Sequence, residues 1–160
     1  MSAFYGSVTN KFDAKGRISV PARFRAVVGD DALQGVCCFA AFVADAIEGY
    51  TGQGMERYAE QIRKLEKYSV DREAFEHSVL GSTYDLTFDS EGRILLPEHL
   101  LKHARLLGAS AATFVGLGDH FEIWEPQAYE EKVAKARAIA AERRLMLDAP
   151  RGGTPQGGAR

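Results

Sequence analysis

Basic residues are concentrated in one short stretch near the amino end of the chain. Residues 9–25 contain five basic side chains and a single acid, and therefore carry a net charge of +4. Lysine and arginine side chains bind the phosphates of nucleic acids, and arginine also contacts the O6 and N7 atoms of guanine. The candidate DNA contacts are therefore Lys11, Lys15, Arg17, Arg23 and Arg25.

The basic stretch overlaps a motif that occurs twice. Residues 12–21, FDAKGRISVP, match residues 88–97, FDSEGRILLP, at a constant offset of 76, with six of the ten positions identical. The identities include a glycine and a proline, which constrain backbone geometry. The pattern indicates a duplication. We define repeat 1 as residues 1–50 and repeat 2 as residues 81–126, with a linking helix and connection over residues 51–80.

Each copy of the motif predicts a tight turn at which two strands meet. In the sequence Asp-x-x-Gly-Arg the aspartate can accept backbone hydrogen bonds, and the glycine can adopt a positive φ. These structural roles fall on Asp13 and Gly16 in repeat 1 and on Asp89 and Gly92 in repeat 2.

The two turns differ in charge. Residues 85–101 hold one basic residue against four acids, a net charge of −3, whereas the equivalent window of repeat 1 carries +4. Arg17 and Arg93 can each pair with the aspartate four positions earlier. We favour that structural role for Arg93, since surface ion pairs are common, and a DNA contact for Arg17, because basic neighbours surround it. DNA should approach repeat 1 and avoid the same face of repeat 2.

Apolar residues at even spacings predict strands on both sides of each turn. Pro21 and Pro97 are then suited to the first position of a short helix, where a missing N–H removes no hydrogen bond. We expect Gly29 and Gly108 to end these two helices. Further strands are predicted at Val36–Val43, at Ala112–Leu117 and at Phe121–Trp124.

A longer helix is predicted after each repeat. Apolar residues recur at spacings of three and four from Met55 to Leu65, and a similar stripe begins at Tyr129 in a C-terminal helix over residues 127–147. These stripes should pack on the sheet or on a neighbouring subunit. Residues 148–160 contain no large apolar side chain, so we predict a disordered tail.

Two further residue pairs could support chemistry, and we assign neither of them to a site. Cys37 and Cys38 are adjacent in an apolar stretch, where alternation would point one inward and one outward, and we interpret them as strand packing. His99 and His103 are spaced i, i+4, but no third metal ligand accompanies them. No nucleophile elbow or phosphate-binding glycine loop occurs. We therefore predict no enzyme activity, cofactor, metal or small-molecule ligand.

The overall charge and the length of the apolar runs limit the classes of partner that the protein can have. A net charge of −2 argues against a nucleic-acid binder when taken alone, so the local charge distribution decides that question. The longest apolar run, residues 36–44, has nine residues, whereas a membrane-spanning helix needs about twenty. The first residues also lack the pattern of a signal peptide. We expect a cytoplasmic, nucleoid-associated protein without membrane contact.

The motifs together resemble the MraZ family of the AbrB/SpoVT superfamily. The resemblance rests on residues 13–17 and 21–25, DAKGR and PARFR, on residues 89–93, DSEGR, and on residues 121–124, FEIW. It implies a mixed β protein with helices, in which two AbrB-like repeats form a double-split, swapped-hairpin β-barrel followed by a C-terminal helix. It also implies a ring-like homo-oligomer that binds direct repeats in promoter DNA upstream of the division and cell-wall gene cluster.

By position, the DNA-contacting turn of that family falls on Lys15 and Arg17, followed by the basic helix with Arg23 and Arg25. The last two are two positions apart on a short helix, so at most one should face the same surface as the turn. The alternative within the superfamily is an antitoxin-type protein-interaction module. Its tail would need apolar anchors, and residues 148–160 contain none of large size.

Overall fold

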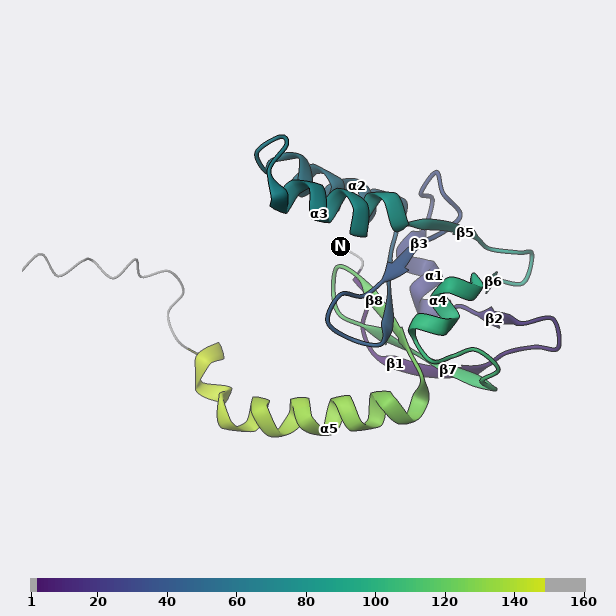
Figure 1. Cartoon of the computed structure of the whole chain (residues 1–160). Helices are drawn as coiled ribbons and strands as arrows, with labels where there is room; N and C mark the ends of the chain where they lie inside the picture. Colours follow the sequence, from purple (N-terminus) through teal and green to yellow (C-terminus); the bar gives the residue numbers. More distant parts are fainter. Residues whose placement is uncertain (1–2, 149–160) are drawn as a thin grey trace, which may run out of the picture. The chain divides into compact units, whose positions relative to one another are not determined.

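The structure is a computed structural model that describes residues 3–148. The chain divides into two compact units, the first ending at Pro126 and the second beginning at Gln127, and each is described by itself. The first unit contains all the strands together with four of the α-helices, and the second holds one long helix (Figure 1). The predicted tail lies outside the described residues, apart from Asp148.

Six antiparallel strands form the main sheet of the first unit, and two more form a small separate sheet. The strands are β1 (Ser7–Lys11), β2 (Arg17–Ser19), β3 (Gly35–Ala40), β4 (Ala46–Tyr50), β5 (Tyr84–Thr87), β6 (Arg93–Leu95), β7 (Ala111–Gly116) and β8 (Phe121–Trp124). The order in the main sheet is β1-β7-β8-β4-β3-β5, and β2 pairs with β6. The predicted mixture of sheet and helix is confirmed, but the strands of residues 3–148 form no closed barrel.

The two repeats exchange strands. The first strand of repeat 1, β1, pairs with β7 of repeat 2, and the first strand of repeat 2, β5, pairs with β3 of repeat 1. Residues related by the offset of 76 also lie opposite each other in the pairs Ile18–Ile94 and Ile47–Ile123. Residues 1–50 and 81–126 therefore pair with each other at equivalent positions, and neither segment forms the main sheet without strands of the other.

The strands that flank each motif turn do not continue as a hairpin. After the turn of repeat 1, β1 stays paired with β7 while β2 pairs with β6, and a single bridge between Phe12 and Ile18 joins the two sides. Ile18 is completely buried, which draws β2 toward the core and away from β1. The expected close meeting of two strands is therefore limited to the base of the turn.

Four phenylalanines form the centre of the main core. The rings of Phe4, Phe24, Phe114 and Phe121 are all but completely buried. Neighbouring ring centroids lie between 5.1 and 6.3 Å apart, which is the range of favourable tilted and edge-on contacts. Gly49 on β4 lies under Phe121, and a Cβ atom at this position would overlap the ring. The aromatic core therefore depends on this glycine.

The two short helices pack on this core. Helices α1 (Ala22–Val28) and α4 (Glu98–His103) begin directly after Pro21 and Pro97. Each proline is the N-cap residue and not, as was predicted, the first helical residue. Gly29 ends α1 with φ +55°, as expected. Gly108 does not end α4, which stops at His103 with Ala104 as its cap, so that prediction was wrong. The reason is tertiary: Leu106, beyond the helix, turns into the core and is 1% exposed.

The connection between the repeats contains two helices instead of the single predicted one. Helix α2 (Gly52–Arg63) begins at Thr51, whose hydroxyl accepts a hydrogen bond from the backbone of Gly54. Helix α3 (Val70–Ser78) begins at Ser69, whose hydroxyl accepts one from Arg72. Figure 1 shows α2 and α3 side by side. The stripe on α2 packs on the sheet as predicted, in a second core of Phe39, Tyr50, Ile62 and Val79 with Met55 and Tyr58 against it.

The second unit consists of helix α5 (Pro126–Glu142) and a 3-10 turn, η2 (Arg144–Leu147). No residue of α5 is buried. A second 3-10 turn, η1 (Leu80–Ser82), lies between α3 and β5 in the first unit. Among residues 3–148, no helix combines the length and the apolar character needed to cross a membrane.

Candidate nucleic-acid interface

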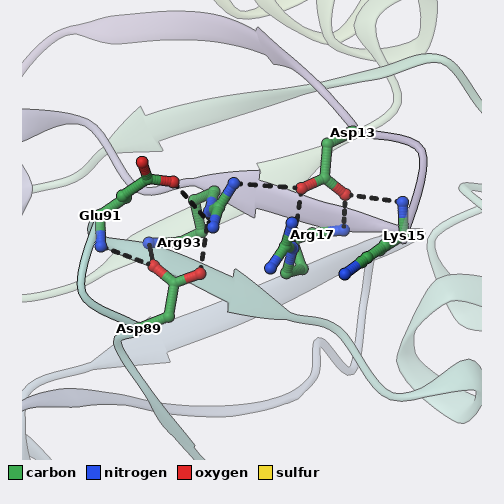
Figure 2. A network of polar contacts seen from close by, with 6 residues as sticks. All are labelled: Asp13, Lys15, Arg17, Asp89, Glu91 and Arg93. Atoms are coloured by element: carbon green, nitrogen blue, oxygen red, sulfur yellow. Dashed lines mark hydrogen bonds and ion pairs between the residues drawn. The ribbon is translucent and has the colours of Figure 1, made fainter.

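The carboxylate of Asp13 organises the first loop, which we define as residues 13–17. Its Oδ1 accepts hydrogen bonds from the backbone N–H groups of Lys15 and Arg17, at 2.9 and 2.8 Å (Figure 2). Its Oδ2 accepts one from Arg17 Nε, at 2.8 Å. Gly16 adopts φ +80°, a conformation that suits glycine. These contacts fix the loop with the side chain of Lys15 exposed at its tip.

The second loop, residues 89–93, repeats this geometry. Asp89 Oδ1 accepts hydrogen bonds from the backbone of Glu91 and of Arg93, both at 2.9 Å, and Asp89 Oδ2 accepts one from Arg93 Nε at 2.8 Å. Gly92 has φ +75°. The hydrogen bonds and positive φ values expected of the two motifs are therefore present in both loops.

The two loops lie next to each other and share one ion-pair network (Figure 2). Arg93 Nη1 lies 3.4 Å from Asp13 Oδ2, and Arg93 Nη2 lies 2.8 Å from Glu91 Oε2. Arg93 thus contacts three carboxylates, including that of Asp89. Within the described part of the chain, Arg17 has an ion pair with Asp13 alone. The cationic group of the second loop is neutralised by its neighbours, while the first loop retains positive charge.

Both loop carboxylates are held in their ionised form. Desolvation raises the pKa of Asp13, but hydrogen bonds from Arg17 and Lys15 outweigh it, so that the pKa lies below its ordinary value. Hydrogen bonds from the backbone of Arg93 and of Glu91 lower the pKa of Asp89 in the same way. The contact with Asp89 raises the pKa of Arg93. The charged forms of Asp13, Asp89 and Arg93 are therefore favoured.

Arg25 belongs to repeat 1 but lies against the loop of repeat 2. Its Nε donates a hydrogen bond to the backbone oxygen of Val20 at 3.1 Å, and a Cβ atom on Gly92 would come within 2.7 Å of its Cδ. The backbone N–H of Val20 also donates to the oxygen of Gly92, at 3.1 Å. The sequence did not predict the contact between Arg25 and Gly92, because nothing near Arg25 in the sequence signals it.

The other basic candidates are placed differently. Lys11 is exposed at the end of β1, two residues before the first loop. Arg23 lies near the opposite end of β1, where a Cβ atom on Gly6 would be 2.9 Å from its Nη1. At about 3.3 Å per residue, this is on the order of 20 Å from the first loop. The structure therefore brings Lys15, Arg17 and Arg25 to the paired loops, with Lys11 beside them, and leaves Arg23 apart.

The remaining reactive side chains form no second site. Cys37 and Cys38 are free thiols on β3, and both are buried, so the packing role expected of them is confirmed and neither is exposed. Cys37 on β3 lies opposite Asp85 on β5, whose Oδ1 accepts a hydrogen bond from Sγ at 3.3 Å. Burial raises the pKa of Cys37 to about 12, which leaves it protonated and unreactive. His103 contacts the backbone oxygen of Ala44, and residues 3–148 contain no cluster of three metal-ligating side chains.

Two similar strand-loop-strand-helix segments, which pair strands with each other in both sheets and present charged loops side by side, define a mixed sheet-and-helix protein with a charged loop surface. The sequence matches the family model described as "MraZ protein, putative antitoxin-like" over residues 3–77 and 79–148. The chain therefore belongs to the MraZ family, and the resemblance drawn from its motifs is confirmed.

Curated relatives agree with this assignment. The protein of Rickettsia felis is 41% identical over 147 residues, which cover 92% of this chain and 97% of the relative. The protein of Rickettsia bellii is 39% identical over 140 residues, which cover 88% of this chain and 92% of the relative. Both are named transcriptional regulator MraZ. The similarity extends over nearly the whole chain, including both loops.

Proposed function

We propose that this protein regulates transcription by binding double-stranded promoter DNA through the first loop. The observation that carries the proposal is the polarity of the paired loops. Lys15 is exposed at the tip of the first loop, where the second loop has Glu91. The guanidinium of Arg93 is bound by three carboxylates, whereas Arg17 has one. The naming of the relatives as transcriptional regulators supports the same function.

The charge difference orients the protein on its target. Duplex DNA carries one negative charge per about 1.7 Å of axis, so it is attracted to the first loop and repelled by the acidic side chains of the second. In this arrangement Lys15 contacts phosphates and Arg17 reaches a base edge in the major groove. Arg25 and Lys11 add positive charge beside them, and Arg23 contributes at most a peripheral contact.

One loop offers few base contacts, so we propose that several subunits bind together. A homo-oligomeric ring would present one first loop per subunit to successive direct repeats in the promoter upstream of the division and cell-wall genes, and so bring the protein to the nucleoid. The exchange of β1 and β5 between residues 1–50 and 81–126 supports a swapped-hairpin arrangement of AbrB-like repeats. Residues 51–80 then connect the repeats, and the helix of residues 127–147 follows them.

The test compares matched substitutions in the two loops. Arg17→Ala and Arg93→Ala each remove an arginine that pairs with the aspartate of its own loop. On a duplex from the promoter of the protein's own gene, fluorescence anisotropy should show a loss of about tenfold or more for Arg17→Ala and for Lys15→Glu, because a good arginine–base contact contributes about 1–3 kcal/mol. Arg93→Ala should retain most of the affinity. Equal losses from Arg17→Ala and Arg93→Ala would overturn the proposal.

An antitoxin-type module is the second candidate. The description of the matching family contains the words "antitoxin-like", and the exposed side chains of Leu145, Met146 and Leu147 supply apolar anchors before residue 148. Mixing the protein with the product of a cognate toxin gene tests it. Neutralisation at equimolar ratio, with no specific binding to the promoter duplex, would replace the DNA-binding proposal.

A further inference from the structure

One leucine is exposed on the strand that follows the second loop. Ile94 on β6 is 1% exposed, whereas its neighbour Leu95 is 60% exposed. Successive side chains of a strand point to opposite faces, so the burial of Ile94 in the core directs Leu95 toward solvent. A single exposed leucine is common on protein surfaces. The side chains that lie beside Leu95 therefore decide whether its exposure has a role.

Leu95 belongs to repeat 2 but lies beside the first loop. In the pairing of β2 with β6 it stands directly opposite Arg17. Cross-strand partners of this kind project from the same face of a sheet, with Cβ atoms about 5 Å apart. A Cβ atom at Gly16 would come within 3.7 Å of Leu95 Cδ1. The surface of the first loop therefore includes an apolar group from the other repeat, next to the arginine.

The second loop has a polar residue at the equivalent position. Ser19 matches Leu95 at the offset of 76 and stands opposite Arg93. The tips of the loops differ in the same direction, because Lys15 matches Glu91. An exposed leucine and an exposed lysine thus occur together at the first loop, whereas the second loop has a serine and a glutamate at these positions.

A surface that combines an arginine with an apolar group is suited to the major groove of DNA. Guanine presents two acceptors there to arginine, and thymine presents its C5-methyl group, which cytosine does not have. Successive bases of one strand are about 3.4 Å apart along the axis. Two side chains about 5 Å apart can therefore contact the same base pair or two adjacent ones.

We propose that Leu95 contacts the methyl group of a thymine next to the base that Arg17 reads. The inference rests on the proposed function and adds to it an apolar base contact that favours thymine over cytosine. DNA is the occupant that fits, because the neighbours of the leucine are basic: Arg17 lies opposite it, and exposed Lys15 precedes Gly16. Leu95 is thus a specificity-determining residue supplied to the first loop by repeat 2.

Removal of the thymine methyl group alone tests the contact. Duplexes with one copy of the promoter repeat are synthesised with thymine or with uracil, which lacks only this methyl group. Wild-type protein should bind the uracil duplex about fourfold more weakly, which corresponds to about 0.8 kcal/mol for one buried methyl group. Leu95→Ala should bind the thymine duplex more weakly than wild type and should not distinguish the two duplexes. Uracil at one thymine at a time then identifies the contacted base.

Leu117→Ala is the matched control. Leu117 is 47% exposed and follows β7, whose opposite end pairs with Lys11 near the first loop. This variant should distinguish uracil from thymine as the wild type does, and both variants should keep the wild-type circular dichroism spectrum. A Leu95→Ala variant that binds more weakly but still prefers thymine fourfold would show that the leucine only supports the loop. Unchanged affinity of Leu95→Ala for both duplexes, as expected if another protein chain covered the leucine, would also reject the contact.

The same titrations separate this inference from DNA binding itself. A wild type that binds both duplexes equally well, and in a Lys15-dependent way, would reject the leucine contact and leave the proposed function in place. A wild type that binds the promoter repeat no more tightly than a duplex of shuffled sequence would reject the proposed function, and the leucine contact with it.

Discussion

At the scale of single residues, the carboxylates of Asp13 and Asp89 preorganise the two loops. Each accepts two backbone hydrogen bonds and one from an arginine side chain of its own loop. A loop that is ordered before binding loses less conformational entropy when it meets its partner. In the proposed binding mode, Asp13 therefore contributes by fixing the position of Lys15, although its carboxylate has the same sign of charge as DNA.

The carboxylates of the two loops should make the free energy of unfolding depend on pH. The pKa values of Asp13 and Asp89 are lower in the folded chain than their ordinary values. Their stabilising contribution is therefore present above the unfolded pKa, near 4, and is lost as the pH falls through the lower folded pKa. We expect the free energy of unfolding in urea to decrease between about pH 5 and pH 2. Asp13→Asn/Asp89→Asn should flatten this decrease, and an unchanged pH profile would contradict the assignment.

Gly49 should tolerate no side chain. A Cβ atom at this position would overlap the ring of Phe121 in the centre of the core. We expect Gly49→Ala to lower the free energy of unfolding by about 1–3 kcal/mol, as for other overpacked cores. Gly81→Ala is the matched control, because its Cβ would meet Glu76 at an ordinary 3.5 Å, and it should change stability by less than about 0.5 kcal/mol. The measurement is urea denaturation followed by circular dichroism.

At the scale of secondary-structure elements, Arg72 connects α3 to the end of α2. Its Nη1 donates to the backbone oxygens of Arg63 and Leu65, at 3.4 and 3.3 Å, and its Nε lies 3.6 Å from Glu76 Oε2. The side chain is 17% exposed, so solvent screens these contacts only in part. Helices α2 and α3 are therefore held together by this arginine and by their packing.

Removing this arginine should loosen the helix pair without unfolding the sheet. Arg72→Met keeps an apolar stem but loses the hydrogen bonds, and we expect amide hydrogen exchange over residues 64–78 to become about tenfold faster, equivalent to about 1.4 kcal/mol. The control is Arg63→Met, whose exposed pair with Glu60 should contribute less than about 1 kcal/mol. Equal protection of residues 64–78 in Arg72→Met and wild type would show that packing alone holds the helices.

The elements also show which predictions a sequence supports. The loop geometry and strand β8 depend on local patterns, and the structure contains both. Helix α3 was missed because few of its residues are apolar. The end of α4 was misplaced because the burial of Leu106 determines where the chain turns, although Gly108 is the better local signal. Local rules identify elements, whereas packing sets their limits.

The candidate site shows the same difference between features that local sequence predicts and features that depend on tertiary contacts. The charge contrast between the loops could be read from Lys15 and Glu91, which stand at equivalent positions of the repeats. The contact between Arg93 and Asp13 could not be predicted in this way. It joins residues 80 positions apart, which the pairing of β2 with β6 brings together. The position of Arg25 against the second loop has the same origin. Non-local pairing thus decided which basic residues the fold brings together.

At the scale of the whole molecule, a net charge of −2 makes the proposed DNA binding depend on orientation and assembly. In that proposal, DNA approaches the first loop and is repelled by the acidic side chains of the second. Each chain offers few cations, so the affinity of an assembly should rise with the number of first loops engaged at once. The same number should determine how strongly salt weakens binding, because every neutralised phosphate releases condensed counterions.

This dependence yields a quantitative prediction. The slope of log affinity against log salt is about −0.9 per phosphate contact, so Lys15→Ala should reduce the slope of the wild-type assembly by about one unit for every engaged subunit. On a duplex that carries a single repeat, the same substitution should reduce the slope by about one unit in total. Titrations of both duplexes at several salt concentrations provide the slopes. A flat salt response of the wild type would exclude phosphate contacts by the first loop, and equal reductions on both duplexes would mean that a single subunit binds the promoter.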